Sequence, residues 1–192
     1  MKKVIPICII VAILVLSVCF VLFRYPSYDL KTLTEKFTIN YNEIESIANE
    51  YKLESKFSVT DESKALKKCY ITVNEKSRIY VEFSTTATET QTGNGTFSIS
   101  YTISDVSDDN NFDIELFTEF VNSISGKEIT ADFLTDFLTA PEEKYSVEKY
   151  GLSDGSYAIE KMHSLNFGED WVIGYNSTYD NHAELWFYGY IK

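Results

Sequence analysis

The stretch CYITVNEKSRIYVEF, residues 69–83, predicts the core of the fold. Apolar and polar residues alternate on both sides of the polar run NEKS at 74–77. We therefore expect a hairpin with one buried and one solvated face. The residues expected to face inward are Cys69, Ile71, Val73, Ile79, Val81 and Phe83. The same alternation returns over residues 96–103, where Ile, Phe and Tyr alternate with Ser and Thr, so a third strand should join the sheet.

Helical spacing marks three further segments. The first is predicted to begin at Asn40, because the apolar residues after it follow the i, i+3, i+4, i+7 spacing of one helix face. The second covers 114–124 and ends at Gly126, a residue typical of helix C-termini. The third begins after Thr130 and stops before Pro141.

Three more strands are predicted over 157–162, 171–175 and 184–191. The chain then runs helix, three strands, one or two helices, three strands. This segregation predicts an α+β fold in which helices cover one face of an antiparallel sheet. The order also suggests two helix-plus-three-strand halves, although the residues themselves show no repeat.

A hydrophobic run at 4–23, VIPICIIVAILVLSVCFVLF, precedes these elements, and 18 of its 20 residues are hydrophobic. A helix of that length spans about 30 Å, the thickness of a bilayer's hydrocarbon core. The two lysines before it favour a cytoplasmic N-terminus. We therefore predict a single-pass cell-membrane protein with a transmembrane anchor over 1–24, a juxtamembrane connector over 25–40 and an extracytoplasmic domain over 41–192. Within the connector, Ser27 is a candidate cap for a short helix that carries Leu30, Leu33 and Phe37 at helical spacing.

Two other interpretations of the run stay open. A cleaved signal peptide usually has a shorter apolar region and a small-residue cleavage site, which this run lacks. A lipoprotein signal is suggested by LSVC at 16–19, but Val18 stands where Gly or Ala is expected. The uncleaved anchor fits the length best.

The charge is distributed unevenly. The chain has 17 basic and 29 acidic residues, a net charge of −12. Residues 1–24 hold three of the basic residues and no acidic one, so the remaining 168 residues carry a net −15. A body this acidic is a poor nucleic-acid binder, because phosphate contacts need a basic face. It would instead attract a basic protein.

One acidic loop is a candidate calcium site. Asp109, Asn111 and Asp113 match the first three ligand positions of an EF-hand loop. The match then fails, since Ile114 and Phe120 stand where the loop needs Gly and a bidentate Glu. The competing interpretation is a solvated loop that caps the following helix.

Catalytic signals are few. His163 and His182 are the only histidines, and a carboxylate such as Glu160 or Glu184 would have to complete a hydrolase site with them. Cys69, alternating with apolar residues, is expected to be buried and inert. No nucleophile-elbow or phosphate-loop motif occurs. We predict neither enzymatic activity nor a cofactor.

The last predicted strand carries aromatic residues on one face, Trp186, Tyr188 and Tyr190, and apolar residues on the other. Such a strand is either central and covered on both sides, or it leaves an aromatic patch open for a protein or ligand.

Lys outnumbers Arg 15 to 2, a bias that points to an AT-rich bacterial genome. Together these features predict a bacterial, membrane-anchored protein whose acidic domain is a binding module for a protein or ligand. Two alternatives remain open. One is an inhibitor or immunity-type protein that masks a basic toxin or hydrolase, and the other is an extracytoplasmic hydrolase. The oligomeric state does not follow from the sequence.

Overall fold

The computed structural model describes residues 26–61, 66–106, 111–140, 146–151, 157–166, 170–177 and 182–191. These residues form a mixed α+β fold with an eight-stranded antiparallel sheet, which confirms the predicted class. The elements in chain order are α2 (Leu30–Glu50), β1 (Glu54–Asp61), β2 (Leu66–Thr72), β3 (Ser77–Thr85), β4 (Gly95–Ile103), α3 (Ile114–Ser125), α4 (Ala131–Leu138), β5 (Ser146–Gly151), β6 (Tyr157–Asn166), β7 (Trp171–Ser177) and β8 (Ala183–Tyr190).

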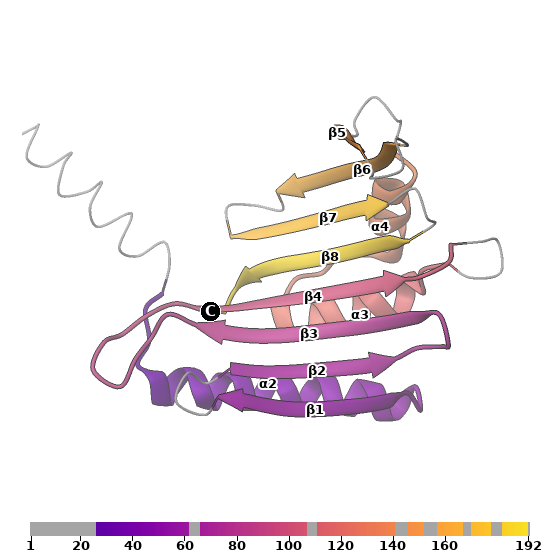
Figure 1. Ribbon diagram of the computed structural model, residues 1–192. Helices are drawn as coiled ribbons and strands as arrows, with labels where there is room; N and C mark the ends of the chain where they lie inside the picture. Colours follow the sequence, from indigo (N-terminus) through magenta and orange to yellow (C-terminus); the bar gives the residue numbers. More distant parts are fainter. Residues whose placement is uncertain are drawn as a thin grey trace, which may run out of the picture.

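The sheet consists of two four-stranded meanders that meet at its centre. Its strand order is β1-β2-β3-β4-β8-β7-β6-β5, so the last strand of each meander pairs with the other (Figure 1). The antiparallel β4–β8 register places Ile99 beside Phe187 and Ser100 beside Trp186. Each half of the described chain thus consists of helix followed by a meander, and the strand order of the sheet is pseudo-twofold.

Each half has four strands, so the prediction of three was wrong. The missed strands, β1 and β5, form the two edges of the sheet. Their sequences, ESKFSVTD and SVEKYG, contain few apolar residues. Edge strands typically carry charged residues that discourage pairing with other chains, and this weakens the alternation by which a strand is predicted.

All three described helices lie on one face of the sheet, behind it in the view of Figure 1. Helix α2 packs on β1 to β3 and against α3, which in turn contacts β4 and α4. Farther along the sheet, Phe137 of α4 stacks on His163 of β6 with ring centroids 4.4 Å apart. The opposite face carries no helix within the described residues.

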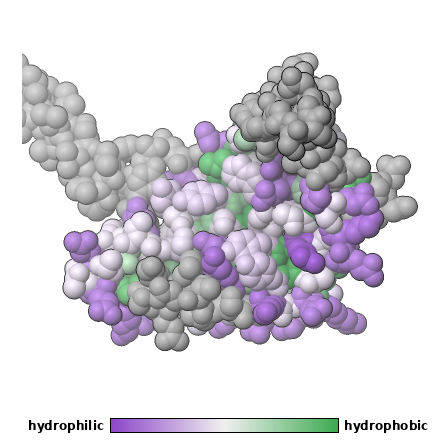
Figure 2. Space-filling view, viewed as in Figure 1, coloured by the Kyte–Doolittle hydropathy of each residue, from purple (hydrophilic) through white to green (hydrophobic). Residues whose placement is uncertain are grey.

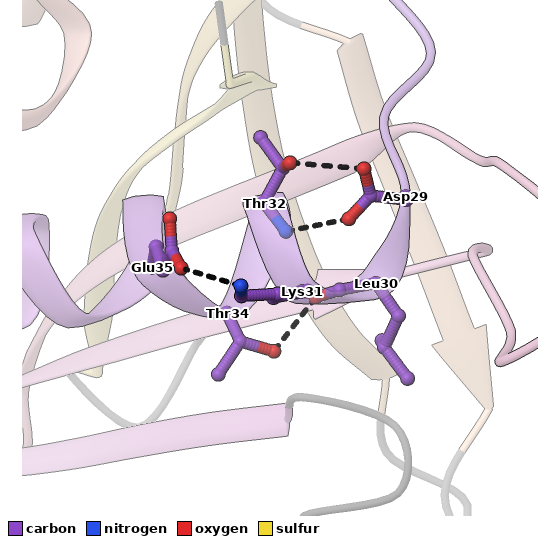
Figure 3. A network of polar contacts seen from close by, with 6 residues as sticks. All are labelled: Asp29, Leu30, Lys31, Thr32, Thr34 and Glu35. Carbon is purple, nitrogen blue, oxygen red and sulfur yellow. Dashed lines mark hydrogen bonds and ion pairs between the residues drawn. The ribbon is translucent and has the colours of Figure 1, made fainter.

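Helix α2 begins ten residues before the predicted start at Asn40, so that prediction was wrong. Its cap is Asp29, whose carboxylate accepts hydrogen bonds from the Thr32 backbone N–H at 2.8 Å and the Thr32 hydroxyl at 3.0 Å (Figure 3). Leu33 and Phe37 are fully buried. Residues 30–40 of the predicted connector thus belong to a helix of the core.

One uninterrupted stripe explains this long helix. Leu33, Phe37, Tyr41, Ile44 and Ala48 recur at the three- to four-residue spacing of one helix face, and no Gly or Pro separates them. Asn40 lies in the middle of the helix. A residue type that favours caps does not end a helix whose buried face continues past it.

The later helices follow the sequence closely. Gly126 ends α3 in the left-handed conformation, with φ 60°, and Thr130 caps α4 by accepting from the Phe133 N–H. The predicted strands near 69–83, 96–103 and the C-terminus are present as β2, β3, β4, β6, β7 and β8. These predictions are confirmed.

No helix among the described residues is both long enough and apolar enough to cross a membrane. The hydrophobic run at 4–23, on which the predicted anchor rests, lies outside the described residues.

Candidate functional site

An open groove of about 620 Å³ lies between α2 and α3, with the first residue of α4 at its border. Three carboxylates line it, Glu43 from α2 and Glu115 and Glu119 from α3. The other lining residues are Ser46, Ile47, Thr118, Asn122, Ser123 and Ala131. We call this feature the acidic groove. It combines negative charge, hydroxyl groups and the apolar side chain of Ile47.

The acidic groove lies in the most negative layer of the molecule. Residues 29–52 and 113–138, which hold the three helices, carry eleven acidic and four basic residues. The strands and loops described elsewhere carry ten acidic and seven basic residues. Among the described residues, no ion pair neutralises the three carboxylates of the groove. Their negative charge therefore faces solvent without a fixed counter-charge.

Local hydrogen bonds hold the walls of the acidic groove in place. The Tyr51 hydroxyl, just after α2, donates to Glu119 at 2.6 Å and ties the two helices together. This hydrogen bond, with some desolvation, raises the pKa of Tyr51 to about 12. The Asn122 side chain clamps the loop after α3, accepting from the Ile129 N–H at 2.9 Å and donating to the Ile129 carbonyl at 2.8 Å.

The three carboxylates come from two helices, and the sequence does not mark them as a group. Glu115 and Glu119 are four residues apart, a spacing that places both on one face of a helix. That spacing was a usable signal for half of the groove. The position of Glu43 opposite them depends on how α2 packs on α3, which no local pattern specifies.

The aromatic residues singled out in the sequence lie on the face without helices. Trp186 and Tyr190 are half-buried there, and Tyr188 is 38% exposed. Leu185 and Phe187 point the other way and are fully buried under the helices. Strand β8 is thus central in the sheet but covered on one side only within the described residues.

Other side chains extend this face across the sheet. Tyr70 of β2 lies against Tyr80 of β3 with ring centroids 4.8 Å apart. Next to them Lys68 pairs with Glu82 at 3.0 Å, and the Tyr80 hydroxyl also donates to Glu82. Burial raises the pKa of Tyr80 to about 12, with the Glu82 hydrogen bond adding to it. We call the whole surface the open sheet face.

The candidate calcium loop is only partly described, since Asp109 lies outside the described residues. Asn111 accepts a hydrogen bond from the Phe112 N–H at 2.9 Å. Asp113 caps α3, its carboxylate accepting from the Leu116 N–H at 3.0 Å. Asn111 and Asp113 thus accept local backbone hydrogen bonds, as expected of a loop that caps the following helix.

The two histidines do not come together. His163 lies on the helix-covered side of β6, and His182 precedes β8, two strands away. The register and strand spacings separate their backbones by about 14 Å. Glu184 faces the opposite side from His163 and accepts a hydrogen bond from the Ser100 hydroxyl. The Glu160 side chain lies outside the described part.

Cys69 lies under the helices, 1% exposed. Burial, with a smaller effect from Glu45, raises the pKa of its thiol from 9.0 to about 12. The thiol therefore stays protonated at neutral pH and is a poor nucleophile. Within the described residues, no group of three or more His, Cys, Asp and Glu side chains is arranged to hold a metal ion.

No family model, curated protein or solved structure matches this chain.

Proposed function

We propose that this chain is a membrane-anchored, non-enzymatic binding module, and that its acidic groove docks a basic segment of a partner protein. The observation that carries the proposal is the set of three carboxylates in the groove, Glu43, Glu115 and Glu119, without ion-pair partners in the described structure. A Lys- or Arg-containing segment supplies the missing counter-charge.

The other lining groups fit the same occupant. Long basic side chains place their methylene stems on apolar surface and their charged ends in polar surroundings. Ile47 offers the apolar contact, while the hydroxyls of Ser46 and Thr118 offer hydrogen-bond acceptors beside the carboxylates.

The charge of the helical layer supports fast and selective capture. Its eleven acidic and four basic residues create a negative field that attracts a basic partner before contact. Such steering weakens steeply with salt, because the Debye length falls from about 10 Å at 0.1 M to about 3 Å at 1 M ionic strength.

The groove is tested by binding of a fluorescent lysine- and arginine-rich peptide to the full chain, with a glutamate-rich peptide of equal length as control. We expect the basic peptide alone to bind, and more weakly as salt increases. The double variant Glu115→Gln/Glu119→Gln should weaken binding by about tenfold, the effect of about 1.4 kcal/mol.

A matched variant separates the groove from general charge. Glu128→Gln/Asp136→Asn removes two negative charges from the same layer but from residues that do not line the groove. It should weaken binding only about twofold, as expected for exposed charges. Equal losses in the two double variants would show that the peptide binds a diffuse field and that the acidic groove is no specific site.

The anchor is tested separately, by fractionating cells that produce the tagged full chain and washing the membranes with alkaline carbonate. The proposal expects the chain to resist extraction, because about 20 apolar residues insert stably into a bilayer. Recovery of the chain in the soluble fraction would contradict the anchor and leave the groove test unaffected.

An inhibitor or immunity-type protein is a narrower form of the same proposal. It requires the basic partner to be a toxin or hydrolase whose activity falls on binding. The same two double variants then test whether inhibition follows the acidic groove.

A further inference from the structure

We propose that the open sheet face is a self-association surface, on which two copies of this chain pack sheet to sheet to form a four-layer helix–sheet–sheet–helix dimer. This inference does not depend on the acidic groove, which lies on the other side of the sheet.

The first support is the chemistry of the face. Figure 2 looks onto it and shows a mostly pale, weakly polar surface over the middle strands. Large side chains stand partly exposed on it, with Tyr70 at 50%, Tyr188 at 38% and Met162 at 38% exposure. Tyr, Trp and Met are the residues enriched in the interiors of protein interfaces.

The second support is charge, which distinguishes the two faces. On the open sheet face, the strand side chains described include three acidic and three basic residues: Glu54, Lys56, Lys68, Arg78, Glu82 and Glu184. Their charges cancel, whereas the helical layer is strongly negative. Two copies that meet through their helices would repel each other.

Packing through the sheets instead moves the acidic layers apart. Stacked sheets lie about 10 Å apart, and each helical layer adds about 10 Å on the outside. The acidic surfaces are then about 30 Å from each other, well beyond the Debye length of about 8 Å at physiological salt. The charge pattern therefore selects a second copy docked on the open face.

The third support is area. Eight strands spaced about 4.8 Å apart, each about 24 Å long, present about 800 Å². A standard stable interface buries about 800 Å² on each partner. The sheet as a whole is therefore about as large as one partner's share of a standard interface.

The fourth support is the position of the aromatic residues. Strands β4 and β8 lie at the centre of the sheet, where its two meanders meet. An in-plane twofold axis through that centre packs these strands against the same two strands of the other copy. Trp186 and Tyr188 then lie in the middle of the interface, where residues that dominate binding energy concentrate.

The test is cross-linking of the full chain in native membranes. Ser98 lies on the open face of β4, beside Tyr188, and Ser98→Cys places a thiol near the expected twofold axis. With a bis-maleimide linker about as long as the sheet-to-sheet spacing of 10 Å, we expect a covalent dimer. The matched control is Asp132→Cys on the exposed surface of α4, which should give none. The parent chain gives the background from its own cysteines.

Trp186→Lys/Tyr188→Lys in the Ser98→Cys background should reduce the dimer at least tenfold, because four lysines would meet at one centre. Near-ultraviolet circular dichroism of Trp171, the remaining tryptophan, checks that this variant is folded. Rim substitution Tyr70→Lys gives a second, milder test with an expected loss of about twofold. Cross-linking should persist in high salt, unlike binding of the basic peptide.

A Ser98→Cys chain that cross-links no more than the parent would overturn the proposal. A dimer equally strong in the folded double-lysine variant would do the same, since association would then come from another surface. More cross-linking through Asp132→Cys than through Ser98→Cys would place the interface on the helices and refute the sheet-to-sheet arrangement.

Discussion

Two tryptophans on neighbouring strands, one on each side of the sheet, allow the two faces to be compared directly. Trp171 of β7 lies opposite Gly189 of β8, and Trp186 of β8 lies opposite Gly174 of β7. In both pairs the indole occupies the space that a glycine side chain would fill. Trp171 is 2% exposed beneath the helical layer, whereas Trp186 remains partly exposed on the open sheet face.

The two Trp–Gly pairs therefore have different roles. Beneath the helices, Trp171 contacts Phe97 and Phe187, with ring centroids 4.9 and 5.5 Å away, and contributes to the core. On the other face Trp186 lacks such a covering layer in the described structure. Packing energy should depend mainly on the first pair, and association of copies mainly on the second.

Removing the two indoles should show the largest difference between the faces. We expect Trp171→Ala to lower the free energy of unfolding by about 3–5 kcal/mol, because it leaves a large cavity in a closed core. Trp186→Ala should cost about 1 kcal/mol, since its site is already partly in contact with water. Urea unfolding of the dilute full chain, followed by far-ultraviolet circular dichroism, measures both values. Equal losses would contradict the assignment of one tryptophan to the core.

The opposing glycines provide the next test. A Cβ on Gly189 would lie 1.7 Å from a Trp171 ring carbon, and one on Gly174 would lie 2.0 Å from a Trp186 ring carbon. Gly189→Ala should lower the free energy of unfolding by about 3 kcal/mol, because Trp171 is packed in the core and has no space to move. Gly174→Ala should cost less than about 1 kcal/mol, because Trp186 can turn toward solvent.

The glycine pair is compared by thermal unfolding of the two variants side by side. A Gly174→Ala chain as unstable as Gly189→Ala would mean that Trp186 is held as rigidly as Trp171. The same variant should also weaken the proposed dimer, since it displaces the central aromatic residue.

Alkaline pH tests the covered face through Cys69. Its thiol pKa of about 12 in the folded chain exceeds the ordinary 9.0, so folding favours the protonated form. The protonated thiol's contribution to the free energy of unfolding is intact below pH 9. It is lost as pH rises toward 12, by at most about 1.4 kcal/mol per pH unit. Between pH 8 and pH 10, the free energy of unfolding should fall less with pH in Cys69→Ala than in the parent chain, as measured by urea unfolding at each pH. Tyrosines whose pKa is raised in the folded chain, such as Tyr41 and Tyr80, add their own loss of stability only as pH approaches their ordinary 10.0. They are present in both chains, so the difference between the parent chain and Cys69→Ala reports the thiol.

A solvent-exposed thiol would give the opposite result for Cys69. It would react with a thiol reagent in the native chain at neutral pH, and its replacement would leave the pH slope unchanged. Cys69→Ser is the matched control for size.

The smallest expected effect concerns the loop before α3. Asp113→Ala should lower stability by about 1 kcal/mol, because the helix loses its cap, while Asp113→Asn keeps an acceptor oxygen and should cost less. Both losses should be independent of calcium. A rise in melting temperature with calcium that disappears in Asp109→Ala would instead favour the calcium site.

The elements with strong local signals were predictable. Strands β3 and β4 alternate along their whole length, and α3 and α4 carry recognisable end signals in Gly126 and Thr130. The edge strands gave no such signal, because a strand paired on one side needs fewer apolar residues. The start of α2 was missed for a different reason. The sequence placed Leu30, Leu33 and Phe37 in a separate short helix, whereas the structure has one helix that continues through Asn40, because its buried face packs on the sheet along its whole length.

The candidate sites divide in the same way. Local spacing was enough to put Trp186, Tyr188 and Tyr190 on one face, and composition was enough to make the body acidic. Neither spacing nor composition could show that the helices cover the other face, or that Glu43 lies across a groove from Glu115 and Glu119.

The sequence by itself determined the α+β class, the inward face of each central strand and the excess of negative charge, because periodicity and composition are local properties. Only the tertiary structure decided which side of the sheet is covered, which carboxylates meet and which tryptophan is buried. Those outcomes depend on contacts between segments far apart in the chain, such as β4 with β8 and α2 with α3, whose partners no single stretch of sequence can specify.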